Sequence, residues 1–246
     1  MKIANLLFSA AALASLTACS APAPDAGDTA KSGGCCAKDA PAGKAHHVGK
    51  KLPEFKNADF YKDGKFNEDA AKDAVITLMK FYHHPVRTDT KAKLWVSDYG
   101  TGKFTEVGLA AIMVENEERD RYMIQALFLL PGQMLPEHWH EKPAGDAPAK
   151  MEGWYILGGY TYAVAEGEDN LAKFPEIKIP ASHPAQPKAR HALKLTPGEW
   201  GKLNKQLEHH WQIAGPQGAV MIEVANLHTN SCVKHLVPAI NAHFLK

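Results

Sequence analysis

Two histidines and a glutamate stand at strand-like spacing near the middle of the chain. His138 and His140 are separated by one residue, and Lys150 and Glu152 repeat that spacing further along. Side chains at positions i and i+2 of a β-strand point to the same side of the sheet. Each pair can therefore converge on one point, and a turn between the two strands would bring the pairs together. Imidazole and carboxylate groups suit Mn, Fe, Ni and Zn ions, so this spacing predicts a metal site at His138, His140 and Glu152. The alternative is an exposed strand whose polar residues face solvent.

One helix is predicted ahead of this segment. Asn67 can cap a helix over residues 66–82, and the acidic residues that follow it suit the positive end of the helix dipole. Apolar residues from Ala71 to Tyr82 recur at helical spacing, and Pro85 ends the pattern.

Short apolar segments separated by turn residues follow the helix. Pairs of glycine and proline, such as Pro131-Gly132 and Gly215-Pro216, mark the turns. Many short strands with such turns predict a β-sandwich or a β-barrel. We expect strands at residues 93–97, 104–114, 122–130, 153–164, 177–179, 192–195, 210–213 and 219–224, and we expect residues 235–246 to pack on the barrel.

The central segment resembles the first motif of the cupin superfamily. That motif is matched by Gly132-x5-His138-x-His140, followed by Glu152-x6-Gly159 after a longer spacer than usual. More narrowly, the segment is similar to the D-lyxose-isomerase-like sugar isomerases, which share the lysine two residues before the metal-binding glutamate. The resemblance covers residues 59–224. It implies a mainly β fold, a cupin barrel (a double-stranded β-helix, or jelly roll) with an N-terminal helix.

The second cupin motif carries one more histidine, and two neighbours compete for that place. Counting forward from Pro197 favours His209. Counting back from the turn at Gly215 favours His210, and it also keeps intact the His-Trp pair of the isomerases. Adjacent side chains of a strand point to opposite faces, so at most one of them reaches the metal. We predict that His210 is the fourth ligand.

The resemblance also implies a reaction, in which a proton moves between neighbouring carbons of a sugar. Three histidines and one glutamate leave two positions of an octahedral ion for two sugar oxygens, and the ion would acidify the C–H bond between them. Lys150 is the candidate proton donor or electrostatic clamp. Glu223 follows the Gly215 turn, where the resembled enzymes carry an acid–base glutamate. The expected cofactor is Mn²⁺, with Fe²⁺, Zn²⁺ or Ni²⁺ as alternatives, and the expected substrate is a small carbohydrate-like molecule.

The chain departs from the isomerases after Glu223. They continue with a polar segment that contains aspartate, whereas this chain continues with Val224 to His228. A metal site can persist while the reaction changes. Two alternatives therefore remain, a different metalloenzyme such as a dioxygenase and a non-catalytic lipoprotein that binds metal or sugar. Bound iron with oxygen uptake would identify the first, and retained metal without turnover of any sugar would identify the second.

Residues 1–18 have the order of a bacterial export signal. Lys2 precedes an apolar run from Ile3 to Leu16, and the small residues that follow lead to Cys19. This order resembles the lipobox of bacterial lipoproteins. It predicts cleavage before Cys19, lipidation of its thiol, and a membrane-anchored protein that faces the periplasm. Ser20 favours the outer membrane if the organism is Gram-negative.

The remaining composition predicts a tether followed by one domain. Residues 19–55 are rich in Ala, Pro, Gly, Asp and Lys without a hydrophobic period, so they indicate a flexible tether to a cupin domain at residues 56–246. Lipidation of Cys19 leaves Cys35, Cys36 and Cys232, an odd number, so at least one thiol is free or pairs between molecules. The formal charge of +1 argues against a nucleic-acid partner. Cupins often form dimers, so a homodimer is a further expectation.

Overall fold

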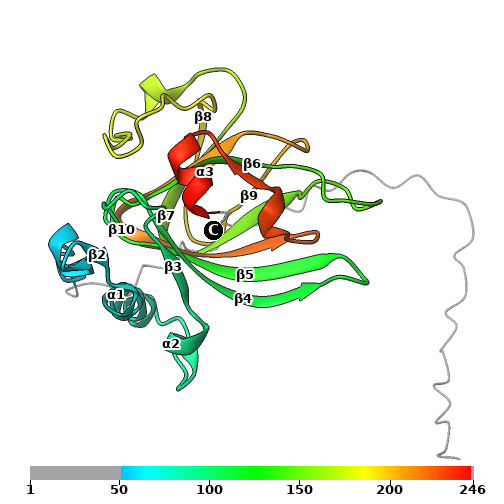
Figure 1. Cartoon of the computed structure of the whole chain (residues 1–246). Helices are drawn as coiled ribbons and strands as arrows, with labels where there is room; N and C mark the ends of the chain where they lie inside the picture. Colours follow the sequence, from blue (N-terminus) through cyan, green and yellow to red (C-terminus); the bar gives the residue numbers. More distant parts are fainter. Residues whose placement is uncertain (1–50, 245–246) are drawn as a thin grey trace, which may run out of the picture. The chain divides into compact units, whose positions relative to one another are not determined.

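Antiparallel strands dominate the computed structural model, which describes residues 51–244 (Figure 1). Nine of the described strands form one sheet, and two short ones form a separate hairpin. The strands are β1 (Tyr61–Lys62), β2 (Lys65–Phe66), β3 (Trp95–Ser97), β4 (Leu109–Glu117), β5 (Tyr122–Leu129), β6 (Met134–His140), β7 (Glu152–Ala165), β8 (His191–Leu195), β9 (Trp200–Lys202), β10 (His210–Ala225) and β11 (Val233–His235). The helices are α1 (Glu68–Phe81), α2 (Thr90–Lys93) and α3 (Pro238–Phe244), with short 3-10 turns η1 (Asn57–Phe60), η2 (Leu171–Lys173) and η3 (Asn230–Cys232).

The sheet curls because its two longest strands change neighbours along their length. β10 pairs with β6 through its first residues and with β5 through its last, while β7 follows its other edge. β7 pairs in turn with β8 near its end and with β9 near its start. Figure 1 shows the result, with β6 on one side of an interior and β4 and β5 on the other. The predicted mainly β barrel of the cupin type is confirmed as a curled antiparallel half-barrel.

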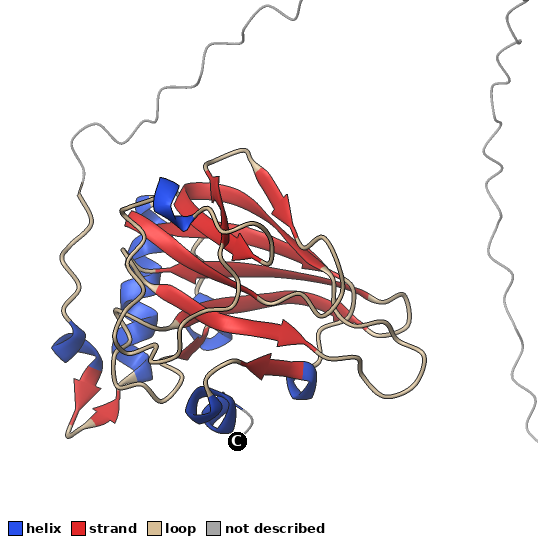
Figure 2. Ribbon diagram, turned by 90° about the horizontal axis from the view of Figure 1, so that it is seen from above, coloured by secondary structure: helices blue, strands red, loops and turns tan. Residues whose placement is uncertain are grey.

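α1 confirms the predicted helix and covers part of the outer face of the sheet. Its first turn is capped by Asn67, whose Oδ1 accepts a hydrogen bond from the backbone N–H of Ala70 at 3.2 Å. The buried side of the helix, which includes Val75 and Leu78, shares one apolar cluster with Phe128 of β5. Figure 2 shows α1 lying beside the strands at one edge of the domain. Burial of this apolar face anchors the helix to the sheet.

Four of the expected strands differ from the observed ones. Residues 177–179 form no strand; their isoleucines pack beside Tyr162 in a separate apolar cluster. Residues 104–108 precede β4 because the side chain of Phe104 is buried against Phe60, with ring centroids 5.1 Å apart, instead of entering the sheet. The two strands expected around Gly215-Pro216 are one continuous strand, β10. The C-terminal residues pack on the sheet as expected, with Ile240 in the interior cluster.

Two glycines allow β7 and β10 to bend together. Gly159 and Gly218 both have positive φ, +67° and +74°, and the pairing register of the two strands shifts beside them. A Cβ atom built on Gly159 would lie 2.0 Å from the carbonyl oxygen of Gly218. Glycine is therefore required here both for its backbone conformation and for the close approach of the two chains.

We expect Gly159→Ala to lower the free energy of unfolding by about 3 kcal/mol, because backbone strain and a backbone clash each cost about 1–3 kcal/mol. Gly64→Ala is the matched control. Gly64 has the same φ of +74° as Gly218, yet nothing lies within 4 Å of its Cβ position, so it should show the strain alone, about 1 kcal/mol. Urea unfolding of both variants measures the difference, and equal losses would contradict the proposed clash.

The predicted export signal, Cys19 and most of the tether lie outside the described residues, as do Cys35 and Cys36. Within residues 51–244, Cys232 has no disulfide partner. Among residues 51–244, no helix is long and apolar enough to cross a bilayer.

Candidate metal centre and active site

The curl of the sheet brings the predicted chemical groups together across its interior. β6 and the start of β10 contribute from one side, where His138 pairs with His210. The start of β7 and the end of β10 contribute from the other, where Glu152 pairs with Ala225. Four buried residues each offer a donor atom, and these atoms all lie within 4.8 Å of one another. The four residues are His138, His140, Glu152 and His210.

His209 lies outside this group, on the opposite face of its strand. Its ring stacks on Trp139 with centroids 4.3 Å apart, and its Nδ1 lies 2.8 Å from Oε1 of the buried Glu137. The alternation of side chains along β6 explains both contacts, because Trp139 and Glu137 point away from the interior that His138 faces. The structure therefore places His210, rather than His209, among the four. His209 ties the start of β10 to β6.

Backbone carbonyls determine which ring nitrogen of two histidines faces the group. Nδ1 of His138 lies 2.9 Å from the carbonyl oxygen of Pro136, and Nδ1 of His210 lies 2.8 Å from that of Glu208. A carbonyl oxygen can only accept, so Nδ1 is the donor in both rings, and Nε2 is the atom left to bind a metal. This second hydrogen bond is typical of metal-binding histidines.

The remaining distances fit a divalent cation between these donors. Nε2 of His210 lies 2.7 Å from Oε1 of Glu152. Nε2 of His140 is buried without a hydrogen bond, 3.3 Å from Oε2 of the same carboxylate. A divalent cation between His210 and Glu152 would accept a lone pair from Nε2 and another from the carboxylate. Imidazole and carboxylate donors together suit a first-row divalent metal, so these residues fit the predicted ion.

The protonation states of the group also favour metal binding. Burial lowers the pKa of His140 to about 4. Burial, with repulsion from the neighbouring imidazoles, places the pKa of His138 well below its usual range. Burial alone would raise the pKa of Glu152, but the charge of Lys150 lowers it well below its usual value. Neutral imidazoles and an ionised carboxylate are the forms that coordinate metals.

Lys150 connects this group to a second buried carboxylate. Its Nζ forms ion pairs with both Glu152 and Glu223, and Nε2 of Gln125 donates to the other oxygen of Glu223 at 3.1 Å. Burial alone would lower the pKa of Lys150, but the two carboxylates raise it, so Lys150 is an ammonium. Burial and the charge of Glu152 raise the pKa of Glu223 to about 7. A proton donor and a proton acceptor thus lie next to the metal-binding group.

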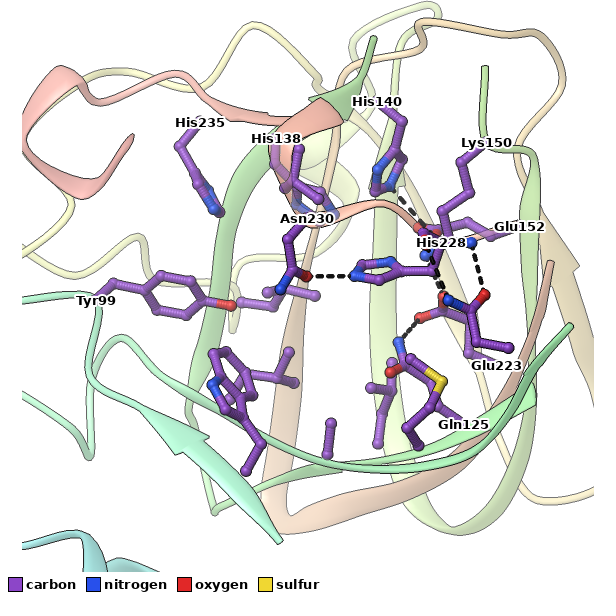
Figure 3. A pocket seen from close by; sticks show the side chains of 18 of the residues that line it. Tyr99, Gln125, His138, His140, Lys150, Glu152, Glu223, His228, Asn230 and His235 are labelled. Atoms are coloured by element: carbon purple, nitrogen blue, oxygen red, sulfur yellow. Dashed lines mark hydrogen bonds and ion pairs between the residues drawn. The ribbon is translucent and has the colours of Figure 1, made fainter. Parts of the chain in front are cut away.

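These residues form the inner end of a cavity of about 490 Å³ (Figure 3). Several other residues that line this cavity had no predicted role. Gln125 carried a detectable signal, because it is a polar residue inside the apolar segment that became β5. Loops contribute Tyr99 and His228, η3 contributes Asn230, and β11 contributes His235; none of these segments has a periodic pattern. Only the fold brings them to the cavity.

Solved structures share this fold. The L-ribose isomerase of Cellulomonas parahominis superposes with a TM-score of 0.56 at 15% identity, covering 72% of this chain and 94% of that one. The L-ribose isomerase of Acinetobacter sp. DL28, solved with L-ribose, gives a TM-score of 0.55 at 15% identity, covering 73% and 94%. The domain therefore has the cupin-type fold of these sugar isomerases.

The family itself follows from the sequence. The sequence model of the D-lyxose isomerase family matches residues 85–232, so the chain belongs to that family. A D-lyxose ketol-isomerase of Thermofilum sp. is 28% identical over 156 residues, which is 63% of this chain and 83% of that protein. The predicted resemblance to these isomerases is thereby confirmed.

Proposed function

We propose that the protein is a metal-dependent isomerase that interconverts an aldose and its ketose. The observation that carries the proposal is the buried ammonium of Lys150, which lies between Glu152 and Glu223 beside the histidine group. Aldose–ketose conversion needs an acid and a base at adjacent carbon and oxygen atoms. Membership of the D-lyxose isomerase family supports this reaction, as does the L-ribose bound to a protein of the same fold.

We assign the proton transfers to two side chains. A bound divalent ion would act as a Lewis acid on the sugar carbonyl and so acidify the neighbouring C–H bond. Glu223, whose pKa of about 7 suits a group that must both take and release a proton, accepts the proton from carbon 2 and returns it to carbon 1. Lys150 delivers a proton to oxygen 1 and receives one from oxygen 2. The net change is the movement of two hydrogens, so no oxidant or reductant is needed.

Mn²⁺ is the ion we propose for the site, held by His138, His140, Glu152 and His210. It accepts imidazole and carboxylate ligands together with sugar oxygens. Fe²⁺, Zn²⁺ and Ni²⁺ accept similar ligands, so the metal content of the purified protein decides between them.

Removal and return of the metal tests the function. We expect the chelated protein to lose turnover of D-lyxose and L-ribose and to unfold at a lower temperature, because an ion that binds only the folded state stabilises it. Mn²⁺ should restore both properties at one equivalent per chain. Stable metal binding without turnover of any aldose would instead indicate a binding protein. Iron accompanied by oxygen consumption would indicate a dioxygenase.

We also propose that the mature protein is anchored through a lipid on Cys19 and forms a homodimer. The order of residues 1–19 supports the anchor, and incorporation of labelled palmitate into the chain but not into Cys19→Ser would test it. Exposed apolar side chains on the outer face of β4, β5 and β10 support the dimer, namely Val114, Tyr122 and Val224. Light scattering measures the molecular mass in solution and so distinguishes a dimer from a monomer.

A further inference from the structure

The cavity continues well beyond the groups that would exchange protons. Its volume of about 490 Å³ lies within the range of about 300–1,000 Å³ that encloses drug-sized ligands. A five-carbon sugar is much smaller than such a ligand. Its carbonyl end would occupy only the part of the cavity beside Lys150, Glu152 and Glu223. The outer part of the cavity therefore has room for a further group on the substrate.

A row of rings lines the way from the metal-binding group to the mouth of the cavity. The ring centroids of His138 and His235 are 5.6 Å apart, those of His235 and Tyr99 are 5.1 Å apart, and those of Tyr99 and Trp95 are 6.3 Å apart. Figure 3 shows His235 beside His138. It also shows Tyr99 pointing into the cavity from the side opposite Lys150 and Glu223. Trp95 and Met113 line the same cavity, and they are 43% and 40% exposed. An apolar, partly aromatic rim thus marks the mouth.

The outer part of the cavity is electrically neutral. The charged residues Lys150, Glu152 and Glu223 line the inner end of the cavity, where they are already assigned to proton transfer and metal binding. At the mouth, the ammonium of Lys93 lies 2.8 Å from a carboxylate oxygen of Asp89, which balances its charge. The polar groups nearby are the hydroxyl of Tyr99 and the side-chain amide of Asn230, whose Oδ1 accepts a hydrogen bond from His228 at 2.7 Å. Such a lining suits a neutral ligand rich in hydroxyl groups.

We infer that Trp95, Tyr99 and His235 form an outer saccharide subsite, and that the preferred substrate is a reducing disaccharide whose aldose unit enters the metal-binding end. This inference rests on the proposed isomerase function. The C–H edges of a sugar ring carry partial positive charge and pack against the negative face of an indole. The hydroxyl groups of the same sugar ring would bond to the hydroxyl of Tyr99 and to the side-chain amide of Asn230.

The chemistry restricts the linkage between the two sugar units. Carbon 1 must be a free carbonyl, and the hydroxyl on carbon 2 must be free because it becomes the ketone. The glycosidic bond is therefore at oxygen 3 or beyond, where it is neither formed nor broken. The same two hydrogens move as in a free aldose, so the product is a disaccharide that ends in a ketose.

β-1,4-Mannobiose and mannose provide a matched pair of substrates. Mannose has the configuration of lyxose at carbons 2 to 4, and mannobiose adds one ring at oxygen 4. We expect kcat/KM to be about tenfold higher for mannobiose than for mannose, as one aromatic contact on the second ring would supply. Trp95→Ala should lower this ratio about tenfold, mainly through the KM of mannobiose, because the contact is equal in the ground and transition states.

Trp200→Ala is the matched control. Trp200 is also exposed, at 47%, but it lies on β9 and does not line the cavity, so its removal should leave the ratio unchanged. Trp95→Leu keeps an apolar side chain without an aromatic face and should resemble Trp95→Ala. Trp95→Leu takes the place of Trp95→Ala in this test if the alanine variant folds poorly.

Each outcome bears separately on the two proposals. Turnover of mannose with a ratio near one, unaffected by Trp95→Ala, would overturn the outer subsite and leave the isomerase standing. If neither sugar is turned over, the isomerase proposal fails for these sugars, and titration calorimetry with mannobiose decides the subsite. Binding that depends on Trp95 but not on Trp200 would support it, and absence of binding would overturn it.

Discussion

Replacement of His210 by alanine is expected to empty the metal site and to abolish turnover. Nε2 of His210 is buried and lies 2.7 Å from Oε1 of Glu152, so its loss removes one of the four donors. Loss of a group that merely orients a ligand already costs about 10–100-fold in metal affinity. We therefore expect a loss of more than about 100-fold for His210→Ala. Calorimetric titration with Mn²⁺ and elemental analysis of the purified variant measure it.

The adjacent His209 provides a control that differs by one position in the chain. His209→Ala should bind Mn²⁺ with its normal stoichiometry, because the His209 ring faces Trp139 and Glu137 outside the cavity. It should still lower the free energy of unfolding by about 1–3 kcal/mol, since Glu137 is buried and loses a hydrogen bond. The assignment of His210 fails if the two variants lose metal equally, or if His210→Ala keeps its full affinity.

Lys150→Met is expected to reduce kcat by about 10²–10⁴-fold, the usual contribution of a positioned acid–base group, while the protein still binds metal. Methionine preserves most of the side-chain volume but supplies neither the proton nor the positive charge. The measurements are kcat for D-lyxose with saturating Mn²⁺ and the metal content of the same sample. A variant with normal turnover would remove Lys150 from the mechanism.

A double variant measures the structural role of Lys150. Loss of the ammonium leaves Glu152 and Glu223 close together without a counter-charge, and breaking a buried ion pair costs about 3–5 kcal/mol. Lys150→Met combined with Glu223→Gln removes the repulsion and should recover much of that stability in urea unfolding. Because the double variant also lacks the proposed base Glu223, it is compared with Lys150→Met in stability alone. A double variant no more stable than Lys150→Met would contradict the structural role.

The metal-binding residues were accessible to sequence reasoning because their geometry is local. The alternation of side chains along a strand placed His138 with His140, and Lys150 with Glu152, without any knowledge of the fold. α1 was equally predictable, since a capping residue, acidic first-turn residues and helical spacing all agree with one element. The strands were less predictable than the helix. Phe104 has the apolar character of a strand residue, but it is buried against Phe60 by a contact that no short segment of sequence contains.

What the sequence by itself determined is the identity of the groups that do chemistry and the side of each strand on which they lie, because the period of two belongs to the strand alone. The tertiary structure decided which groups meet. The register of β10 on β6 placed His210 rather than His209 opposite His138. The curl of β7 and β10, which the contact between Gly159 and Gly218 permits, carried Glu152 and Glu223 across the interior to the histidines. Trp95 and Tyr99 joined the same cavity only through pairing and packing over long sequence separations, because local periodicity carries no information about contacts between distant segments.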